Sequence, residues 1–365
     1  MRLVVFSDLH LDTTFAWAPR EVARRRRANL RETLRAVVAL ADEVDADVLC
    51  SAGDLYEHEH VTPETGRFVH GLLADAGRPV VLVAGNHDPL VPGSLYASLP
   101  WPDHVHVVDA DRLAPLDLVD GVRLWAASHH VTAGTPGFLD DFRVEGDAVH
   151  YALFHGSEEQ SLGRESERKQ PHAPFTSEQI PAAGLAHALV GHFHTPRDGR
   201  WHTYPGNPDP LTFGEDGDRG AVVVDVAADG TPERTRHRVA VSEVHDLTVD
   251  VTGATTTAEV VDRARTALGA TAGEIRVTVT GELAEDLDLQ PQDLTVLTTP
   301  QRCVVPRIGR LGVAHDLDAL AEEQTVRGQF VRSVTADDTL DEDARRRILV
   351  TGLRALDGRD DLEVV

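Results

Sequence analysis

The sequence has few of the features that mark secreted or membrane proteins. Its only two cysteines, Cys50 and Cys303, lie too far apart for a CxxC pair and are too few for a disulfide framework. No stretch approaches the roughly 18 apolar residues of a membrane-spanning helix. Met1 leads directly into an apolar strand, without the segments of a secretion signal. We therefore expect a cytoplasmic chain that does not associate with membranes.

Lysine is almost absent, and acidic residues greatly outnumber basic ones. Lys169 is the one lysine among 35 basic residues, against 60 acidic residues, and the formal net charge is −25. A DNA-binding surface is normally basic, because neutralising phosphates supplies much of the affinity. The overall charge therefore opposes binding to nucleic acid, and a site that binds it needs a local positive field.

The first third of the chain alternates between strand-like and helix-like segments. Short apolar runs at residues 2–6, 47–51 and 79–84 are separated by segments with helical periodicity at 20–43 and 64–76. This order predicts right-handed crossovers and a parallel sheet in an α/β fold. Further strands are expected at 104–108, 122–126, 149–154, 187–190 and 220–226.

At 365 residues the chain is too long for one ordinary core. The pattern changes near residues 228–242, so we predict a catalytic domain over 1–242 and a smaller α+β accessory or capping domain over 243–365. In the second domain we expect strands in HDLTVDV, EIRVTVTG and DLTVLTT, a helix at 257–268, and two closing helices near 316–331 and 340–357.

Five polar clusters occur along the first domain, and most follow directly on an apolar strand. In open α/β sheets, ligands bind beyond the carboxyl ends of the strands. The clusters are therefore expected to meet at one edge of the fold. They are Asp8-Leu9-His10, Gly53-Asp54, Gly85-Asn86-His87-Asp88, His155-Gly156 and Gly191-His192-Phe193-His194.

The spacing within these clusters suits metal binding. In an extended chain, residues i and i+2 point the same way, so Asp8 and His10 can bind one metal while Leu9 turns into the core. His192 and His194 repeat that arrangement. Each cluster alone is weak, since Gly-Asp is a common turn pair, but all five in this order are hard to obtain by chance. Carboxylate, imidazole and amide ligands together favour manganese, iron or zinc over magnesium or calcium.

The motifs SDLH, AGDLYE, GNHD, HG and GHFH together resemble the calcineurin-like metallophosphoesterase superfamily. The resemblance implies a layered αββα sandwich and two divalent metal ions, with Mn²⁺ favoured and Fe²⁺ or Zn²⁺ as alternatives. It implies that one ion is bound by Asp8, His10, Asp54 and His194, and the other by Asp54, Asn86, His155 and His192.

The resemblance also implies catalytic roles for Asn86 and His87. His87 is then a histidine that binds no metal, contacts the substrate phosphate and helps the leaving oxygen depart. Two ions about 3.5–4 Å apart need a shared carboxylate, can activate water and clamp the reacting oxygens. Against the carboxylates of Asp8 and Asp54 they leave about two positive charges, which supplies the local field that the acidic chain otherwise lacks.

Two further stretches resemble SbcD-type DNA repair exonucleases, and the C-terminal stretch resembles the related YhaO branch. They are the APF segment at 173–175 and the turn YPGN at 204–207, which is followed by F-x-E. The resemblance implies a DNA exonuclease or endonuclease with Tyr204 and Asn207 beside the substrate. Glu57 stands where relatives often carry His or Asp, and Asn207 stands where Ser is usual, so the substrate side of the site stays open.

The same resemblance implies partners besides DNA. The second domain either restricts the mouth of the site or docks an SMC-like coiled-coil ATPase of the SbcC/YhaN type, and a homodimer is a further expectation. The simplest alternative is that the terminal helices only cap their own domain.

Two other functions compete with a DNA nuclease. A small-molecule phosphodiesterase or phosphatase would use the same metal site, so the metal ligands cannot choose between the substrates. A binding subunit without activity is opposed by the sequence, because no expected ligand is missing. The four tryptophans could stack on bases, although packing accounts for most of them.

Overall fold

The computed structural model describes residues 1–119, 121–144, 146, 148–161, 171–284, 287, 289–314 and 317–356. The chain divides into two compact units, Met1–Val244 and His245–Val365. Among the residues described, no helix has both the length and the apolar character to cross a lipid bilayer.

The first sheet of the N-terminal unit has the order β12-β11-β1-β2-β3-β4. Strands β1 to β4 are parallel, as the strand–helix–strand pattern predicts, whereas β11 and β12 are antiparallel additions at the edge. The bounds of these strands are β1 (Arg2–Phe6), β2 (Val48–Ala52), β3 (Val80–Val83), β4 (Val105–Val107), β11 (Gly220–Val226) and β12 (Pro232–Arg238).

The second sheet has the order β5-β6-β7-β8-β10-β9. Beyond β8 lie the last two strands of this sheet, β10 and β9. They are three and two residues long, too short to show a pattern in the sequence. The bounds of its strands are β5 (Ala114–Val119), β6 (Val122–Ala126), β7 (Val149–His155), β8 (His187–Gly191), β9 (Arg197–Asp198) and β10 (His202–Tyr204).

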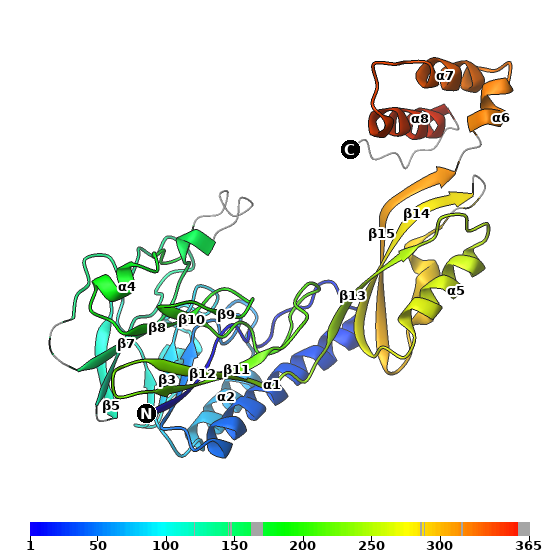
Figure 1. Ribbon diagram of the computed structural model, residues 1–365. Helices are drawn as coiled ribbons and strands as arrows, with labels where there is room; N and C mark the ends of the chain where they lie inside the picture. Colours follow the sequence, from blue (N-terminus) through cyan, green and yellow to red (C-terminus); the bar gives the residue numbers. More distant parts are fainter. Residues whose placement is uncertain are drawn as a thin grey trace. The chain divides into compact units, whose positions relative to one another are not determined.

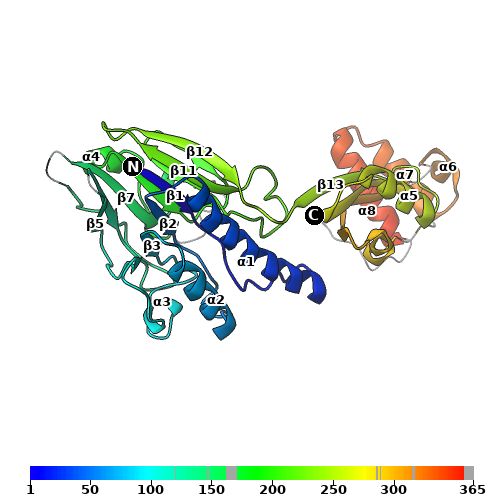
Figure 2. The same cartoon turned by 90° about the horizontal axis from the view of Figure 1, so that it is seen from below.

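Strand alternation explains why the two sheets stack. In β1, Leu3 and Val5 face the second sheet and pack in one core with Leu153, while Val4 and Phe6 face the opposite way into a core with the helices. The helices α1 (Arg20–Glu43) and α2 (Pro63–Ala74) lie side by side against that outer face (Figures 1 and 2).

The outer face of the second sheet has its own cover. Phe154 and Val190 pack there with Phe175 and with Ile180 of the short helix α4 (Gln179–Ala182). The N-terminal unit is therefore the layered αββα arrangement that the motifs imply. Two further short helices of this unit are α3 (Leu95–Ser98) and η1 (Glu159–Ser161).

The C-terminal unit contains a three-stranded sheet of order β13-β14-β15. The strands are β13 (Val244–Asp250), β14 (Gly273–Ala284) and β15 (Arg302–Ala314). Helix α5 (Thr257–Leu268) covers the sheet through Val260 and Ala264, which share a core with Val277 and Val279 of β14.

Two predictions for this unit are wrong. The segment DLTVLTT is largely a 3₁₀ helix, η3 (Pro291–Leu297), because Pro291 occupies its first turn and the Asp293 side chain accepts a hydrogen bond from the Gln290 N–H at 2.9 Å. The helix expected at 316–331 is two helices, α6 (Leu317–Glu322) and α7 (Val326–Thr335).

The break between α6 and α7 has a local cause. The Thr325 side chain accepts a hydrogen bond from the Gly328 N–H at 3.1 Å and so starts a new helix. The last helix, α8 (Glu342–Leu356), packs Leu349 and Leu353 against Leu320 and Val331. Residue 357, the expected end of that helix, lies outside the described residues.

Candidate metal centre

The five polar clusters meet at one edge of the N-terminal unit because backbone hydrogen bonds join their loops. The Asp8 N–H donates to the Gly53 carbonyl at 3.0 Å, and the His10 N–H donates to the Asp54 carbonyl at 3.0 Å. The His192 N–H donates to both carboxylate oxygens of Asp8 at 3.1 Å. Loops that follow β1, β2 and β8 are thereby fixed to one another.

The backbone at the site differs from the extended chain that the spacing suggested. Asp8, His10 and Asp54 have φ values of 56°, 51° and 54°, in the left-handed region that residues with a Cβ rarely occupy. Leu9 does turn fully into the core, as expected. Strained backbone of this kind persists where the surrounding structure enforces it, and it gathers at functional sites.

Two glycines allow the loops to approach each other. A Cβ on Gly85 would collide with the carboxylate of Asp54, and a Cβ on Gly191 would collide with the carbonyl of Ala52. Any side chain at either position would push the candidate ligands apart.

Acidic and histidine side chains, most of them buried, form three groups, and within each group the potential ligand atoms lie within 4.8 Å of one another. Asp8, His10 and Asp54 each belong to two of the groups. The groups are Asp8, His10 and His194; His10, Asp54 and His87; and Asp8, Asp54 and His155.

Asp54 occupies the middle of this arrangement. Its Oδ2 lies 3.1 Å from Nε2 of His155 and 3.7 Å from Nε2 of His10. Burial raises the pKa of the Asp54 carboxyl, but the His155 and His10 imidazoles outweigh burial and hold that pKa well below its usual range. Asp54 is therefore the carboxylate best placed to bridge two cations.

Several buried polar atoms point to missing partners. Nε2 of His10 and Oδ1 of Asn86 have no hydrogen-bond partner among the described residues, and Nε2 of His155 has only the Asp54 carboxylate beside it. Buried polar atoms are normally satisfied, because leaving one unpaired costs about 1–3 kcal/mol. Imidazole nitrogens and an amide oxygen around a shared carboxylate are suitable donors for divalent ions, so these residues fit a two-metal centre.

His192 lies beside these groups but belongs to none of them. Its ring centroid lies 5.2 Å from that of His155. Burial and the neighbouring His155 lower the pKa of His192 to about 2, which keeps the imidazole neutral, the form that binds metal. His192 therefore lies beside the site expected for the second ion, although its imidazole belongs to none of the three groups.

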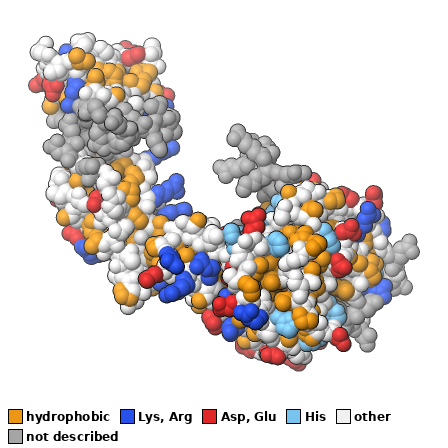
Figure 3. All heavy atoms as spheres, turned by 180° about the vertical axis from the view of Figure 1, so that it is seen from behind, with side chains coloured by type: hydrophobic (Ala, Val, Ile, Leu, Met, Phe, Trp, Pro, Cys, Tyr) orange, Lys and Arg blue, Asp and Glu red, His pale blue; other side chains and the backbone are white. Residues whose placement is uncertain are grey.

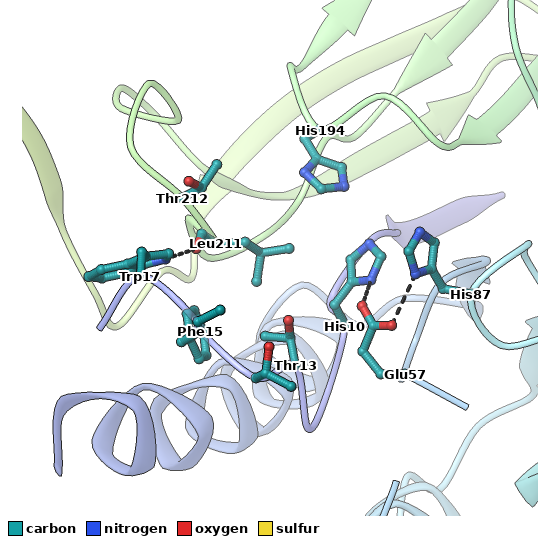
Figure 4. A pocket seen from close by; sticks show the side chains of 11 residues that line it. His10, Thr13, Phe15, Trp17, Glu57, His87, His194, Leu211 and Thr212 are labelled. Atoms are coloured by element: carbon teal, nitrogen blue, oxygen red, sulfur yellow. Dashed lines mark hydrogen bonds and ion pairs between the residues drawn. The ribbon is translucent and has the colours of Figure 1, made fainter. Parts of the chain in front are cut away.

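Glu57 links two of the site histidines, as Figure 4 shows. Its Oε1 lies 2.7 Å from Nδ1 of His10, and its Oε2 lies 3.0 Å from Nδ1 of His87. Burial raises the pKa of Glu57, but the hydrogen bonds to His10 and His87 outweigh it and bring the pKa to about 2. The hydrogen bond to Glu57 in turn raises the pKa of His87 to about 9.

Glu215 makes a similar contact with one ring nitrogen of His194. Its Oε1 lies 2.7 Å from Nδ1 of His194, and its Oε2 accepts from Nδ2 of Asn207 and from the Leu211 N–H, each at 2.6 Å. A carboxylate on one ring nitrogen fixes the orientation of an imidazole and leaves the other nitrogen for a metal. The F-x-E motif marked Glu215 in the sequence, but its contact with His194 could not be read there.

Asp88 joins the GD and GNHD loops through buried hydrogen bonds. Its carboxylate accepts hydrogen bonds from the Gly85 and Leu55 N–H groups, each at 2.6 Å, and from the Asp54 N–H at 3.1 Å. The Tyr96 hydroxyl donates a fourth at 2.6 Å. Sequence reasoning placed Asp88 inside the GNHD motif but assigned it no role.

Tyr204 and Asn207, expected beside the substrate, are fully buried. The Tyr204 hydroxyl donates to the Gly156 carbonyl at 2.8 Å and accepts from the Glu158 N–H at 3.1 Å. The Asn207 side chain is held between Glu215 and Arg219. The structure gives both residues packing and hydrogen-bonding partners away from the open side of the site.

The site opens onto a pocket of about 260 Å³. Its lining includes His10, Glu57, His87 and His194 on the side of the candidate ligands, and Figure 4 shows Trp17 lying across from them. His87 is the most accessible of these histidines, with 46% of its side chain exposed. A reactant that enters the pocket therefore meets His87 and the buried ligands together.

Comparisons with known proteins agree with this geometry. Residues 1–217 match the family described as calcineurin-like phosphoesterase. The chain is 24% identical over 235 residues to an uncharacterised metallophosphoesterase, YhaO, of Bacillus subtilis, covering 60% of this chain and 56% of YhaO. It is 28% identical over 247 residues to the DNA double-strand break repair protein Mre11 of Methanopyrus kandleri, covering 60% of this chain and 52% of Mre11.

The chain thus spans about half the length of the curated relatives it matches. Among solved structures, TT1561 of Thermus thermophilus aligns over 64% of this chain and 98% of its own, with 15% identity and a TM-score of 0.39.

Proposed function

The chain belongs to the calcineurin-like phosphoesterase family, and from that premise we propose that it is a two-metal nuclease that hydrolyses phosphodiester bonds of DNA during repair. The observation that carries the proposal is the buried cluster around Asp54, which His155 contacts at 3.1 Å and in which Nε2 of His10 and Oδ1 of Asn86 lack hydrogen-bond partners among the described residues. The similarity to the repair protein Mre11 supports DNA as the substrate.

The proposed ligands divide into two sets that share Asp54. Asp8, His10, Asp54 and His194 would hold one ion, and Asp54, Asn86, His155 and His192 the other. This mixture of nitrogen and oxygen donors favours Mn²⁺, with Fe²⁺ and Zn²⁺ as alternatives. When bound, the two ions supply positive charge that activates water and stabilises the phosphoryl oxygens.

His87 is proposed to act on the substrate rather than on a metal. Its Nδ1 is engaged by Glu57, so its Nε2 is the atom left to face the pocket. In hydrolysis, water adds to phosphorus and the bond to the leaving sugar oxygen breaks. Nε2 of His87 donates the proton that this oxygen takes up, while Asn86 helps to stabilise the charge that develops.

Local positive charge offsets the acidity of the whole chain. Arg20, Arg24 and Arg27 recur at spacings of four and three along α1, so they lie on one face of the helix. Nη1 of Arg27 lies 3.4 Å from the carbonyl of Thr14, a residue that lines the pocket. Figure 3 shows basic side chains gathered in small groups among acidic ones. These arginines are suited to contact DNA phosphates near the site.

The proposed partners follow from the SbcD/YhaO resemblance. An SMC-like coiled-coil ATPase would dock on the C-terminal unit, and a homodimer would bring two catalytic units to one DNA. Co-purification of the tagged chain from its host tests both, with the eluate sized by light scattering. Recovery of a lone monomer at physiological protein concentration would contradict both partners.

An activity panel tests the substrate. The metal-loaded protein is given single-stranded DNA, duplex DNA, a cyclic nucleotide, a phosphate monoester and bis(p-nitrophenyl) phosphate. We expect DNA to be cleaved with the highest kcat/KM. DNA binding should weaken steeply with salt, and an Arg24→Gln/Arg27→Gln variant should show a shallower slope, because fewer counterions are released. Much faster cleavage of the cyclic or monoester compound would instead identify a small-molecule phosphodiesterase or phosphatase.

A variant tests the division of roles. His87→Ala should bind two ions per chain, as the unaltered protein does, and lose most of its turnover. His87 shares a group with His10 and Asp54, so loss of one ion in this variant would show that His87 is a ligand and that its assignment as proton donor is wrong.

A further inference from the structure

The pocket beside the candidate metal centre has a second wall that the hydrolytic chemistry does not use. Opposite His10, His87 and His194, the pocket is lined by residues 13–17 and by Leu211 and Thr212. These residues come from the loop before α1 and from the loop after β10, so two separate segments build one wall. Figure 4 shows Phe15, Trp17 and Leu211 along it.

Trp17 is held rigidly in this wall. Its Nε1–H donates to the Leu211 carbonyl at 3.1 Å. The ring of Phe213 lies 4.7 Å from the Trp17 ring, and Phe15 meets Trp17 edge-on, with ring centroids 6.1 Å apart. A ligand that stacks on a side chain already fixed in place does not have to immobilise it, so less binding energy is lost.

The loop that carries the wall is itself anchored. Phe15 is almost completely buried and has a φ of 49°, and the guanidinium of Arg26 lies 5.2 Å from its ring. Arg26 is fully buried and paired with Asp209 at 3.2 Å. Asp209 precedes Leu211 by two residues, so Arg26 of α1 links Phe15 of one wall segment to the loop that carries the other.

We propose that this pocket is a nucleobase subsite, in which the base next to the scissile phosphate stacks against the Trp17 wall while the phosphate faces the metal centre. The inference rests on the proposed nuclease function and names the part of the substrate that the site recognises. Base-to-aromatic stacking is available to every base because each has a π face.

The size of the pocket suits a single base. Pockets that hold drug-sized ligands are about 300–1,000 Å³, and this pocket, at about 260 Å³, lies just below that range. We therefore expect the subsite to take a single unpaired nucleotide, such as the end of a single strand or of a frayed duplex.

The polar lining predicts weak discrimination among bases. Thr13, Thr14 and Thr212 are among the lining residues, and a threonine hydroxyl both donates and accepts hydrogen bonds. Such groups adapt to any base edge. The subsite should therefore require a base without requiring a particular one.

The experiment compares strands with and without the base. Two single-stranded oligonucleotides are identical except that the nucleotide at the cleaved end either carries its base or is abasic, and kcat/KM is measured with Mn²⁺. Stacking predicts that the base-bearing strand is preferred by roughly 10- to 100-fold. Trp17→Leu should bring the ratio to within about twofold of unity, because kcat/KM for the base-bearing strand falls toward that for the abasic strand.

A second variant and a binding measurement keep the proposal testable if the Trp17→Leu protein does not fold. Ala16 is exposed and lines the pocket, so Ala16→Trp fills the pocket without disturbing the core and should slow the base-bearing strand more than the abasic strand. A phosphorothioate oligonucleotide that resists hydrolysis should quench part of the tryptophan emission. Trp17→Phe should lose that quenching, and the matched control Trp201→Phe should keep it.

The outcomes separate the two proposals. If the unaltered protein cuts both strands equally, or if Trp17→Leu keeps the preference, the base subsite is wrong and the nuclease stands. If neither strand is cut while bis(p-nitrophenyl) phosphate is hydrolysed, the nuclease proposal fails, and the quenching of Trp17 by the oligonucleotide then decides whether the pocket binds a base.

Discussion

Nδ1 of His10 lies 2.7 Å from Oε1 of Glu57, in a contact that is almost completely buried on the histidine side. The second oxygen of the same carboxylate engages His87. A residue proposed to bind metal and a residue proposed to act on substrate are therefore oriented by one side chain. Their Nε2 atoms are both left to face the site.

Replacing Glu57 by glutamine should impair metal binding or turnover, because one carboxylate serves both histidines. The amide keeps the shape but cannot accept hydrogen bonds at both ends, so one of the two imidazoles loses its orientation. We expect metal affinity or turnover to fall by about 10- to 100-fold. Calorimetric Mn²⁺ titration and hydrolysis of bis(p-nitrophenyl) phosphate measure the two effects. The exposed neighbour Glu59→Gln is the control, and a Glu57→Gln protein equal to it would refute the orienting role.

Metal removal should lower the thermal stability of the N-terminal unit. Each ion that binds only the folded state adds about 3 kcal/mol when its free concentration is 100-fold above Kd. We expect chelation to lower the Tm by about 10 °C, given the size of this unit. Scanning calorimetry with and without EDTA measures the shift. Asp54→Asn, which removes the shared carboxylate, should show little dependence on metal; an unchanged shift in that variant would contradict a bridging Asp54.

Asp88→Asn should destabilise the protein without removing any proposed ligand. Three backbone N–H groups and the Tyr96 hydroxyl donate to this buried carboxylate. The asparagine amide would place its own N–H groups against some of these donors, so those hydrogen bonds would be lost. We expect a loss of about 3 kcal/mol in the free energy of unfolding. Tyr96→Phe removes one donor and should cost about 1 kcal/mol. Urea unfolding compares the two, and equal losses would show that the backbone contacts contribute little.

His187 should make the protein less stable in mild acid. It is fully buried, its Nε2 lies 2.9 Å from the Thr203 hydroxyl, and burial lowers its pKa from 6.5 to about 3. The unfolded chain therefore binds a proton that the folded chain does not, and stability is lost as pH falls below 6.5. At pH 5 the loss from this group is about 2 kcal/mol relative to pH 7.

The variant His187→Gln isolates that contribution. Glutamine can still meet Thr203 but does not titrate, so the difference in unfolding free energy between pH 7 and pH 5 should shrink by about 2 kcal/mol. Both proteins contain the other buried histidines, so the contribution of those histidines to the pH dependence cancels in the comparison. An unchanged pH dependence would mean that His187 is protonated in the folded state.

The positions of β1, β2 and β3 could be predicted because each of these strands is a buried apolar run followed by a polar motif. The αββα layering could be predicted because the five motifs, in their order along the chain, resemble a family with that fold. The C-terminal unit was harder, since short alternating stretches such as DLTVLTT suit either a strand or a helical turn. There, Pro291 and the Asp293 contact to Gln290 override the alternation.

The candidate ligands could be named from sequence, but their supports could not. Glu57 lies 47 residues from His10, and Glu215 lies 21 residues from His194. No local pattern links such pairs, because their contact depends on how separate strands are stacked. The left-handed backbone at Asp8 and His10 was missed for a related reason, since it is imposed by hydrogen bonds from the neighbouring loops.

The contact between Asp8 and the His192 N–H spans 184 residues of chain. During synthesis at about 5–20 residues per second, Asp8 therefore waits on the order of 10–40 seconds before its partner leaves the ribosome. A nascent or truncated chain that ends before β8 carries Asp8, His10 and Asp54 but cannot close the centre around them. The candidate centre thus closes late in synthesis, with the loop that follows β8.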